Sequence, residues 1–167
     1  KGDDYALYIG VSDPRFKLVP HDLDTLMGGG NVGPQPARSI FVYDGLNGLN
    51  EFLNHPDIVP LYYKAFLDLI ETRFNSAELD PILERAIGDF VTPTELNNYK
   101  ESIPARIAGV LAQIPQIFSA TTNLPITAEG YHQTVTGGVN FSGEFHAADT
   151  RSILVNGFSA DLDARAG

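Results

Sequence analysis

The chain has 167 residues, of which 43% are hydrophobic types and 10% are aromatic, and its formal net charge is −10. This composition supplies enough apolar material for one compact domain, with or without a small appendage. The acidic balance repels phosphate backbones and anionic lipid surfaces, so we expect neither nucleic acid nor lipid headgroups as partners. No apolar run approaches the roughly 18 residues needed to span a bilayer, so we expect no membrane insertion. The sequence has no cysteine, which excludes disulfides, thiolate metal sites and a cysteine nucleophile.

The N-terminal residues predict a β-hairpin. Residues 5–11 are aromatic and β-branched, which favours a strand, and the turn sequence SDPR follows with Pro14 at a favourable position. Residues 16–20, FKLVP, predict the second strand. This strand ends directly before the segment His-Asp-Leu-Asp at 21–24. The hairpin therefore delivers a histidine and two carboxylates at its end.

A helical region is predicted after a loop rich in glycine and proline at residues 28–38. From residue 49 onwards the apolar residues follow helical spacing better than alternation. Prolines at 56 and 60 interrupt the pattern, so the long helix is expected to begin near Pro60 and to end near Asn75.

Two further helical segments follow. Residues 76–91 predict a shorter helix with Ser76 as its N-cap. Residues 92–118 predict a third helical region, with Thr94 as its cap. Two prolines are expected to kink or end this region: Pro104 and Pro115.

The last part of the chain is predicted to be rich in β-structure. From about residue 126, short runs of Thr, Val, Phe and Ile are separated by the turn signals TGG, SGE and NG. The sequence VNGF is a good candidate for a hairpin turn. The predicted class is α+β: a short hairpin, a mainly helical part over 1–120, and a small β-rich, sandwich-like tail over 121–167.

The chemistry suggested by the residues is concentrated at the end of the predicted hairpin. Asp22 and Asp24 lie two residues apart, so at the end of a strand both carboxylates can point the same way. Two carboxylates facing one point repel each other unless a cation lies between them, and hard oxygen ligands suit Mg²⁺ or Ca²⁺. The alternative is that one aspartate caps a turn while the other is solvated. His21 either binds a ligand or packs and forms a hydrogen bond.

Other chemical motifs are weak. Asp3 and Asp4 suit a solvated terminus, and the remaining histidines lack the spacing of metal ligands. No GxSxG sequence accompanies the serines, so a hydrolase triad is not supported.

The run YALYIGVSDPRFKLVPHDLDTLMG resembles the signature of the CotH kinase family, atypical protein kinases first associated with spore coats. Members of that family show an aromatic strand, a short turn and a P-W-D-x-D segment, which Pro20, Asp22 and Asp24 match here. The helical region also resembles that of the family, and the likeness covers roughly residues 5–115. His21 stands where the family has tryptophan.

The resemblance implies a protein kinase that transfers the γ-phosphate of ATP to Ser or Thr of surface or secreted proteins, with Mg²⁺ or Mn²⁺. Asp22 would hold the metal, Asp24 would be a second or supporting ligand, and both would be catalytic. Asp4 falls near a further metal-ligand position of the family, and with His21 it would contribute to cofactor binding. An extracellular or cell-surface location is expected on the same ground.

The resemblance also implies a missing part. The lysine that holds the nucleotide, its acidic partner and the catalytic-loop aspartate are expected before residue 1. The chain is therefore expected to be inactive alone and to act with the remainder of its kinase domain. The rival interpretation is a non-catalytic structural or binding module of a secreted bacterial protein, in which Asp22 and Asp24 hold a structural Ca²⁺ or cap a turn.

Overall fold

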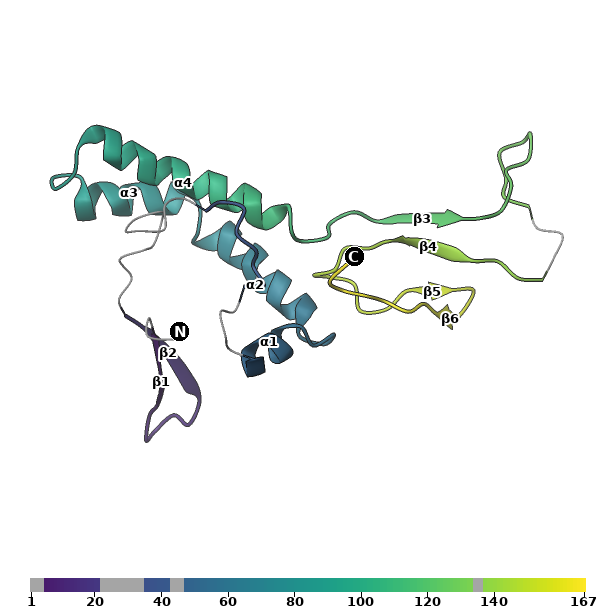
Figure 1. Cartoon of the computed structure of the whole chain (residues 1–167), viewed down its shortest axis with the longest axis horizontal. Helices are drawn as coiled ribbons and strands as arrows, with labels where there is room; N and C mark the ends of the chain where they lie inside the picture. The colour runs from purple at the N-terminus through teal and green to yellow at the C-terminus, as the bar shows by residue number, and fades with distance from the viewer. Residues whose placement is uncertain (1–4, 22–34, 43–46, 134–136) are drawn as a thin grey trace. The chain divides into compact units, whose positions relative to one another are not determined.

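The computed structural model describes residues 5–21, 35–42, 47–133 and 137–167 (Figure 1). In these residues a hairpin is followed by helices and then by small antiparallel strand pairs, so the predicted α+β class is confirmed. The predicted division near residue 120 into a kinase-like part and a β-rich tail stays a prediction. The elements are β1 (Tyr5–Ile9), β2 (Phe16–Pro20), α1 (Asn47–Leu53), α2 (Val59–Thr72), α3 (Ser76–Ile87), α4 (Pro93–Leu111), β3 (Ser119–Thr122), β4 (Phe141–Glu144), β5 (Leu154–Val155) and β6 (Phe158–Ser159).

The chain divides into two compact units, which are described separately. The first unit lies within Lys1–Phe52 and Leu67–Gln113, and the second comprises Leu53–Phe66 and Ile114–Gly167. Helix α2 contributes residues to both units.

The N-terminal hairpin forms as the sequence predicts. Strands β1 and β2 pair antiparallel, with Tyr5 opposite Pro20 and Ile9 opposite Phe16. Every described side chain of β2 is exposed, including Phe16 at 68% and Leu18 at 62%. The hairpin is therefore a two-stranded ladder whose apolar side chains lie in solvent.

Helix α3 begins one residue earlier than its predicted cap implies. Asn75 is the N-cap, and its side chain accepts a hydrogen bond from the backbone N–H of Glu78 at 3.1 Å. The expectation that Ser76 caps this helix is wrong, because the Asn75 oxygen already satisfies the open amide. Helix α3 also ends at Ile87, earlier than the predicted 91.

Helix α4 is capped by Thr92, so the prediction of Thr94 is wrong. The Thr92 hydroxyl accepts from the backbone N–H of Glu95, and the Glu95 carboxylate accepts from the Thr92 N–H at 2.8 Å. This reciprocal pair is a capping box, with Pro93 in the first turn. The helix also continues through Pro104, which therefore does not end it.

The first unit packs around α4. Ile103 and Val110 are buried on this helix at 0% and 4% exposure, one on each side of Pro104, and Ile40 is buried as well. The segment that carries Ile40 is tied to α4 by side-chain bonds: Gln113 accepts from the Ile40 N–H at 2.9 Å, and Arg106 donates to the carbonyl of Arg38 at 2.6 Å. Burial on both sides of the proline explains why the helix continues.

The second unit contains two strand pairs. Strands β3 and β4 pair antiparallel, with Ala120 opposite Gly143. The predicted turn at SGE is wrong, since these residues lie inside β4. Strands β5 and β6 form the hairpin predicted at VNGF, and both turn residues have positive φ, 53° at Asn156 and 86° at Gly157. Positive φ at both positions defines a type I′ turn, which Asn-Gly favours.

The core of the second unit joins α2 to the C-terminal segment. Tyr63 of α2 is completely buried, and its hydroxyl donates to the carbonyl of Arg165 at 3.4 Å. The backbone N–H of Ala147 donates to the carbonyl of Pro115 at 3.1 Å. The buried apolar side chains of this unit are Val59, Tyr63, Ile114, Phe145, Ala147 and Ala148.

Candidate functional site

The hairpin brings together the two residues that adjoin the acidic segments in the sequence. Tyr5 is the first residue of β1 and lies opposite Pro20, the last residue of β2. Asp4 precedes Tyr5 in the chain, and His21 follows Pro20. Antiparallel pairing thus makes both acidic segments continue from the same end of one hairpin.

The predicted ligands themselves cannot be placed. Asp4, Asp22 and Asp24 lie outside the described residues, so their metal-binding roles stay predictions. His21 is described, and it is exposed directly after β2.

At the opposite end of the hairpin, the turn contains ion pairs between Asp13 and two basic side chains. The Arg15 guanidinium donates two hydrogen bonds to the Asp13 carboxylate, both at 2.9 Å, and Lys17 approaches the same carboxylate at 3.4 Å. The bonds from Arg15 lower the pKa of Asp13 to about 2. These groups are solvent-exposed, so they define the geometry of the turn more than they add stability.

The described residues contain no further candidate metal centre. Within them, no group of three or more His, Asp or Glu side chains is arranged to hold an ion. His–Asp pairs do occur among them, with His146 Nδ1 at 3.2 Å from the Asp149 carboxylate and His55 Nδ1 at 3.7 Å from that of Asp57. No helix in the described segments has the length and apolar character needed to cross a bilayer.

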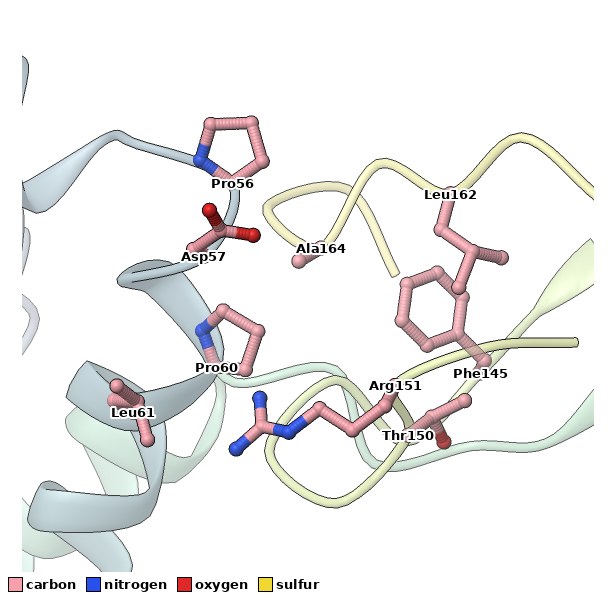
Figure 2. Close-up of a pocket in the computed structure, with 9 residues that line it drawn as sticks. All are labelled: Pro56, Asp57, Pro60, Leu61, Phe145, Thr150, Arg151, Leu162 and Ala164. Carbon is pink, nitrogen blue, oxygen red and sulfur yellow. The ribbon is translucent and has the colours of Figure 1, made fainter.

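A pocket of about 470 Å³ lies in the second unit (Figure 2). One wall is formed where α2 begins and another by the segment after β4, where Phe145 is buried. The C-terminal segment supplies a third wall through Leu162 and Ala164. The complete lining is Pro56, Asp57, Pro60, Leu61, Phe145, Thr150, Arg151, Leu162 and Ala164.

The C-terminal wall of this pocket is held by polar contacts. Arg165 donates a side-chain hydrogen bond to the Asn54 amide oxygen, and its carbonyl accepts from Tyr63. The Asp163 carboxylate accepts from the backbone N–H of Arg165 at 3.0 Å. These bonds fix the segment that carries Leu162 and Ala164 against the residues around α2.

Two charged side chains line the pocket, and the sequence did not indicate either. Arg151 and Asp57 lie far apart in the chain, in segments without a chemical motif. In Figure 2 the Arg151 side chain extends toward the start of α2, and the Asp57 carboxylate faces the open space of the pocket. Apolar side chains occupy most of the remaining lining.

Comparisons with known proteins give no match: no protein-family model, curated protein or solved structure is similar to this chain.

Proposed function

We propose that this chain is part of an atypical protein kinase of the CotH type, and that it supplies the metal-binding end of the catalytic site. The intact protein would transfer the γ-phosphate of ATP to Ser or Thr of secreted or surface proteins. The observation that supports this most is the register of the hairpin, with Tyr5 opposite Pro20.

That register matters because it relates residues that are distant in the chain. Asp4 is one residue from Tyr5, and Asp22 is two residues from Pro20. Consecutive Cα atoms are about 3.8 Å apart, and paired Cα atoms across an antiparallel ladder are about 4.5–5.5 Å apart. The chain can therefore bring Asp4 to the same cation as Asp22 and Asp24 without a long connection.

The donor set fits the proposed metal. Carboxylate oxygens are the hard ligands that Mg²⁺ prefers, and Mg²⁺ is commonly held by one or two carboxylates together with substrate phosphates. In phosphoryl transfer the metal neutralises charge on the phosphates, while the protein positions the reactants. The task of Asp22 and Asp24 would be to bind and orient that cation at the end of the hairpin.

The exposed surface of the hairpin supports a further domain part as the partner. Leu7 and Tyr8 of β1 are 61% and 56% exposed, and they lie on opposite faces of the strand. On β2, Leu18 and Val19 are 62% and 47% exposed. A ladder with apolar residues on both faces is not stable alone in water. We propose that the remainder of the kinase domain covers it, and that the chain by itself has no kinase activity.

The test is to localise a bound metal on this chain by NMR. Paramagnetic Mn²⁺ is titrated into ¹⁵N-labelled protein, and the broadening of each amide signal is followed. We expect the amides of Ala6, Val19 and His21 to broaden before those of Asp13 and Arg15 at the other end of the hairpin. Asp22→Asn should abolish this pattern, whereas Asp161→Asn, an exposed carboxylate of the second unit, should leave it unchanged.

Two outcomes would contradict the proposal. Equal broadening at both ends of the hairpin would show that the metal does not bind preferentially at residues 21–24. Tight binding of Ca²⁺ that ATP does not strengthen, measured by calorimetry on the longer protein, would favour the rival structural module. A kinase site should bind Mg²⁺ more tightly when the nucleotide is present, and Asp22→Ala should remove that gain.

A further inference from the structure

The pocket of the second unit combines two opposite charges with an apolar lining. Arg151 and Asp57 are its charged residues, and Thr150 adds a hydroxyl. Phe145 is 4% exposed and Pro60 is buried, so these parts of the lining are already packed in the core. All the lining residues belong to the same compact unit.

The two charges do not neutralise each other. Asp57 Oδ2 lies 3.7 Å from Nδ1 of His55, outside the pocket lining, and its side chain is 90% exposed. Arg151 forms no ion pair or hydrogen bond within the described part of the chain, so the two side chains are more than 4 Å apart. A guanidinium presents several N–H donors in a planar fork that matches a carboxylate.

We propose that this pocket binds a small zwitterion with an apolar side chain, namely a free apolar α-amino acid or a dipeptide of such residues. Its carboxylate is bound by Arg151 and its ammonium by Asp57, while its side chain packs against Leu162, beside the buried ring of Phe145. Opposite charges separated by a gap, beside an apolar wall, complement a ligand that carries both charges on one short backbone. The site is independent of the proposed metal site, which lies in the first unit.

The affinity is expected to be modest. The carboxylate of Asp57 is largely solvated, and solvated charges attract each other weakly. The apolar contact adds the main favourable contribution, so aromatic and branched side chains should bind more tightly than alanine. A dissociation constant of about 1 mM corresponds to this combination of weak polar contacts and one buried side chain.

The experiment is an NMR titration of the whole chain with L-phenylalanine. We expect the amide signals of Thr150, Arg151 and Ala164 to shift in a saturable manner. Two analogues separate the charges: N-acetyl-phenylalanine lacks the ammonium, and phenylalaninamide lacks the carboxylate. Each should bind about two- to fivefold more weakly, which is the loss expected for one solvent-exposed charge pair.

Variants test the same contacts from the side of the protein. Arg151→Gln should weaken the binding of phenylalanine about two- to fivefold, yet leave the residual binding of phenylalaninamide unchanged. Asp57→Asn should likewise weaken the binding of phenylalanine, yet leave the residual binding of N-acetyl-phenylalanine unchanged, because that analogue lacks the ammonium. Arg73→Gln, an exposed arginine outside the pocket, is the matched control.

Three results would overturn the proposal. The first is the absence of saturable shifts with phenylalanine in a protein whose spectrum is that of the folded state. The second is equal binding of phenylalanine and its two analogues, which would show that the charges do not contribute. The third is a set of shifts located away from the pocket.

Discussion

The hydroxyl of Tyr63 donates to the carbonyl of Arg165 over 3.4 Å, from a side chain with no exposed surface. This bond joins α2 to the C-terminal segment that forms one wall of the pocket. Burial raises the pKa of the Tyr63 phenol, Arg165 nearby lowers it and Asp163 raises it, so that the net value lies above 10.0.

The first prediction concerns stability at high pH. Because the pKa of Tyr63 is raised in the folded state, folded protein holds this proton more tightly than the unfolded chain. The contribution of the protonated Tyr63 phenol to the free energy of unfolding is fully present below about pH 10, and it is lost as the pH rises through the folded-state pKa. Tyr63→Phe should therefore reduce the alkaline slope of the free energy of unfolding, measured with urea at several pH values. Tyr131→Phe, at an exposed position, is the control, and an unchanged slope in Tyr63→Phe would contradict the assignment.

The second prediction tests the cap of α4. Thr92→Ala removes the hydroxyl that accepts from the Glu95 N–H, while the backbone N–H at position 92 can still donate to Glu95. It should lower the free energy of unfolding by about 0.5–2 kcal/mol. Thr94→Ala, two residues into the same turn, should be close to neutral because that side chain is exposed and does not cap the helix. Equal losses for the two variants in urea unfolding would refute the role of Thr92.

The third prediction concerns stability in acid. The backbone N–H of Thr92 is the largest cause that lowers the pKa of Glu95 below 4.5, and the Thr92 hydroxyl adds to it. The stabilisation is present above pH 4.5 and is lost as the pH falls through the lowered pKa. Glu95→Gln should reduce the loss of helix on acidification, followed by circular dichroism.

The fourth prediction uses a glycine that contacts backbone. A Cβ on Gly109 of α4 would overlap the carbonyl oxygen of Pro36. Gly109→Ala should therefore cost about 1–3 kcal/mol, the range found for overpacking. Gly48→Ala in α1 is the matched control, since nothing lies within 4 Å of its added carbon. Similar thermal midpoints for the two variants would show that the segment at 36–40 can move away from the added Cβ without loss of stability.

The hairpin turns were predictable from the sequence because their chemistry is local. Pro14 fixes its own φ in the first turn, and Asn156-Gly157 adopts the positive φ values that few other residues adopt easily. The cap of α4 was also encoded, since Thr92 and Glu95 have capping-box spacing with Pro93 between them. Thr94 was a poorer candidate on that spacing.

Other features depend on contacts between distant segments. Gly143 signals a turn by composition, but it lies in β4 opposite Ala120. An added Cβ would overlap the Ser119 carbonyl of the neighbouring strand, so this close pairing requires glycine. Pro104 suggests a helix end, but burial of Ile103 and Val110 holds the helix together around it. Asp57 and Arg151 line the same pocket although they are 94 positions apart in the sequence. No local sequence pattern predicts that two such distant residues share a pocket.

The exposed ladder of β1 and β2 has a consequence for handling the protein in solution. Within the described residues each strand has one partner, so each has an outer row of amides and carbonyls that a strand from another molecule can meet. The net charge of −10 keeps such molecules apart at low ionic strength. Since the screening length is about 10 Å at 0.1 M salt, added sodium chloride should promote lateral self-association rather than suppress it.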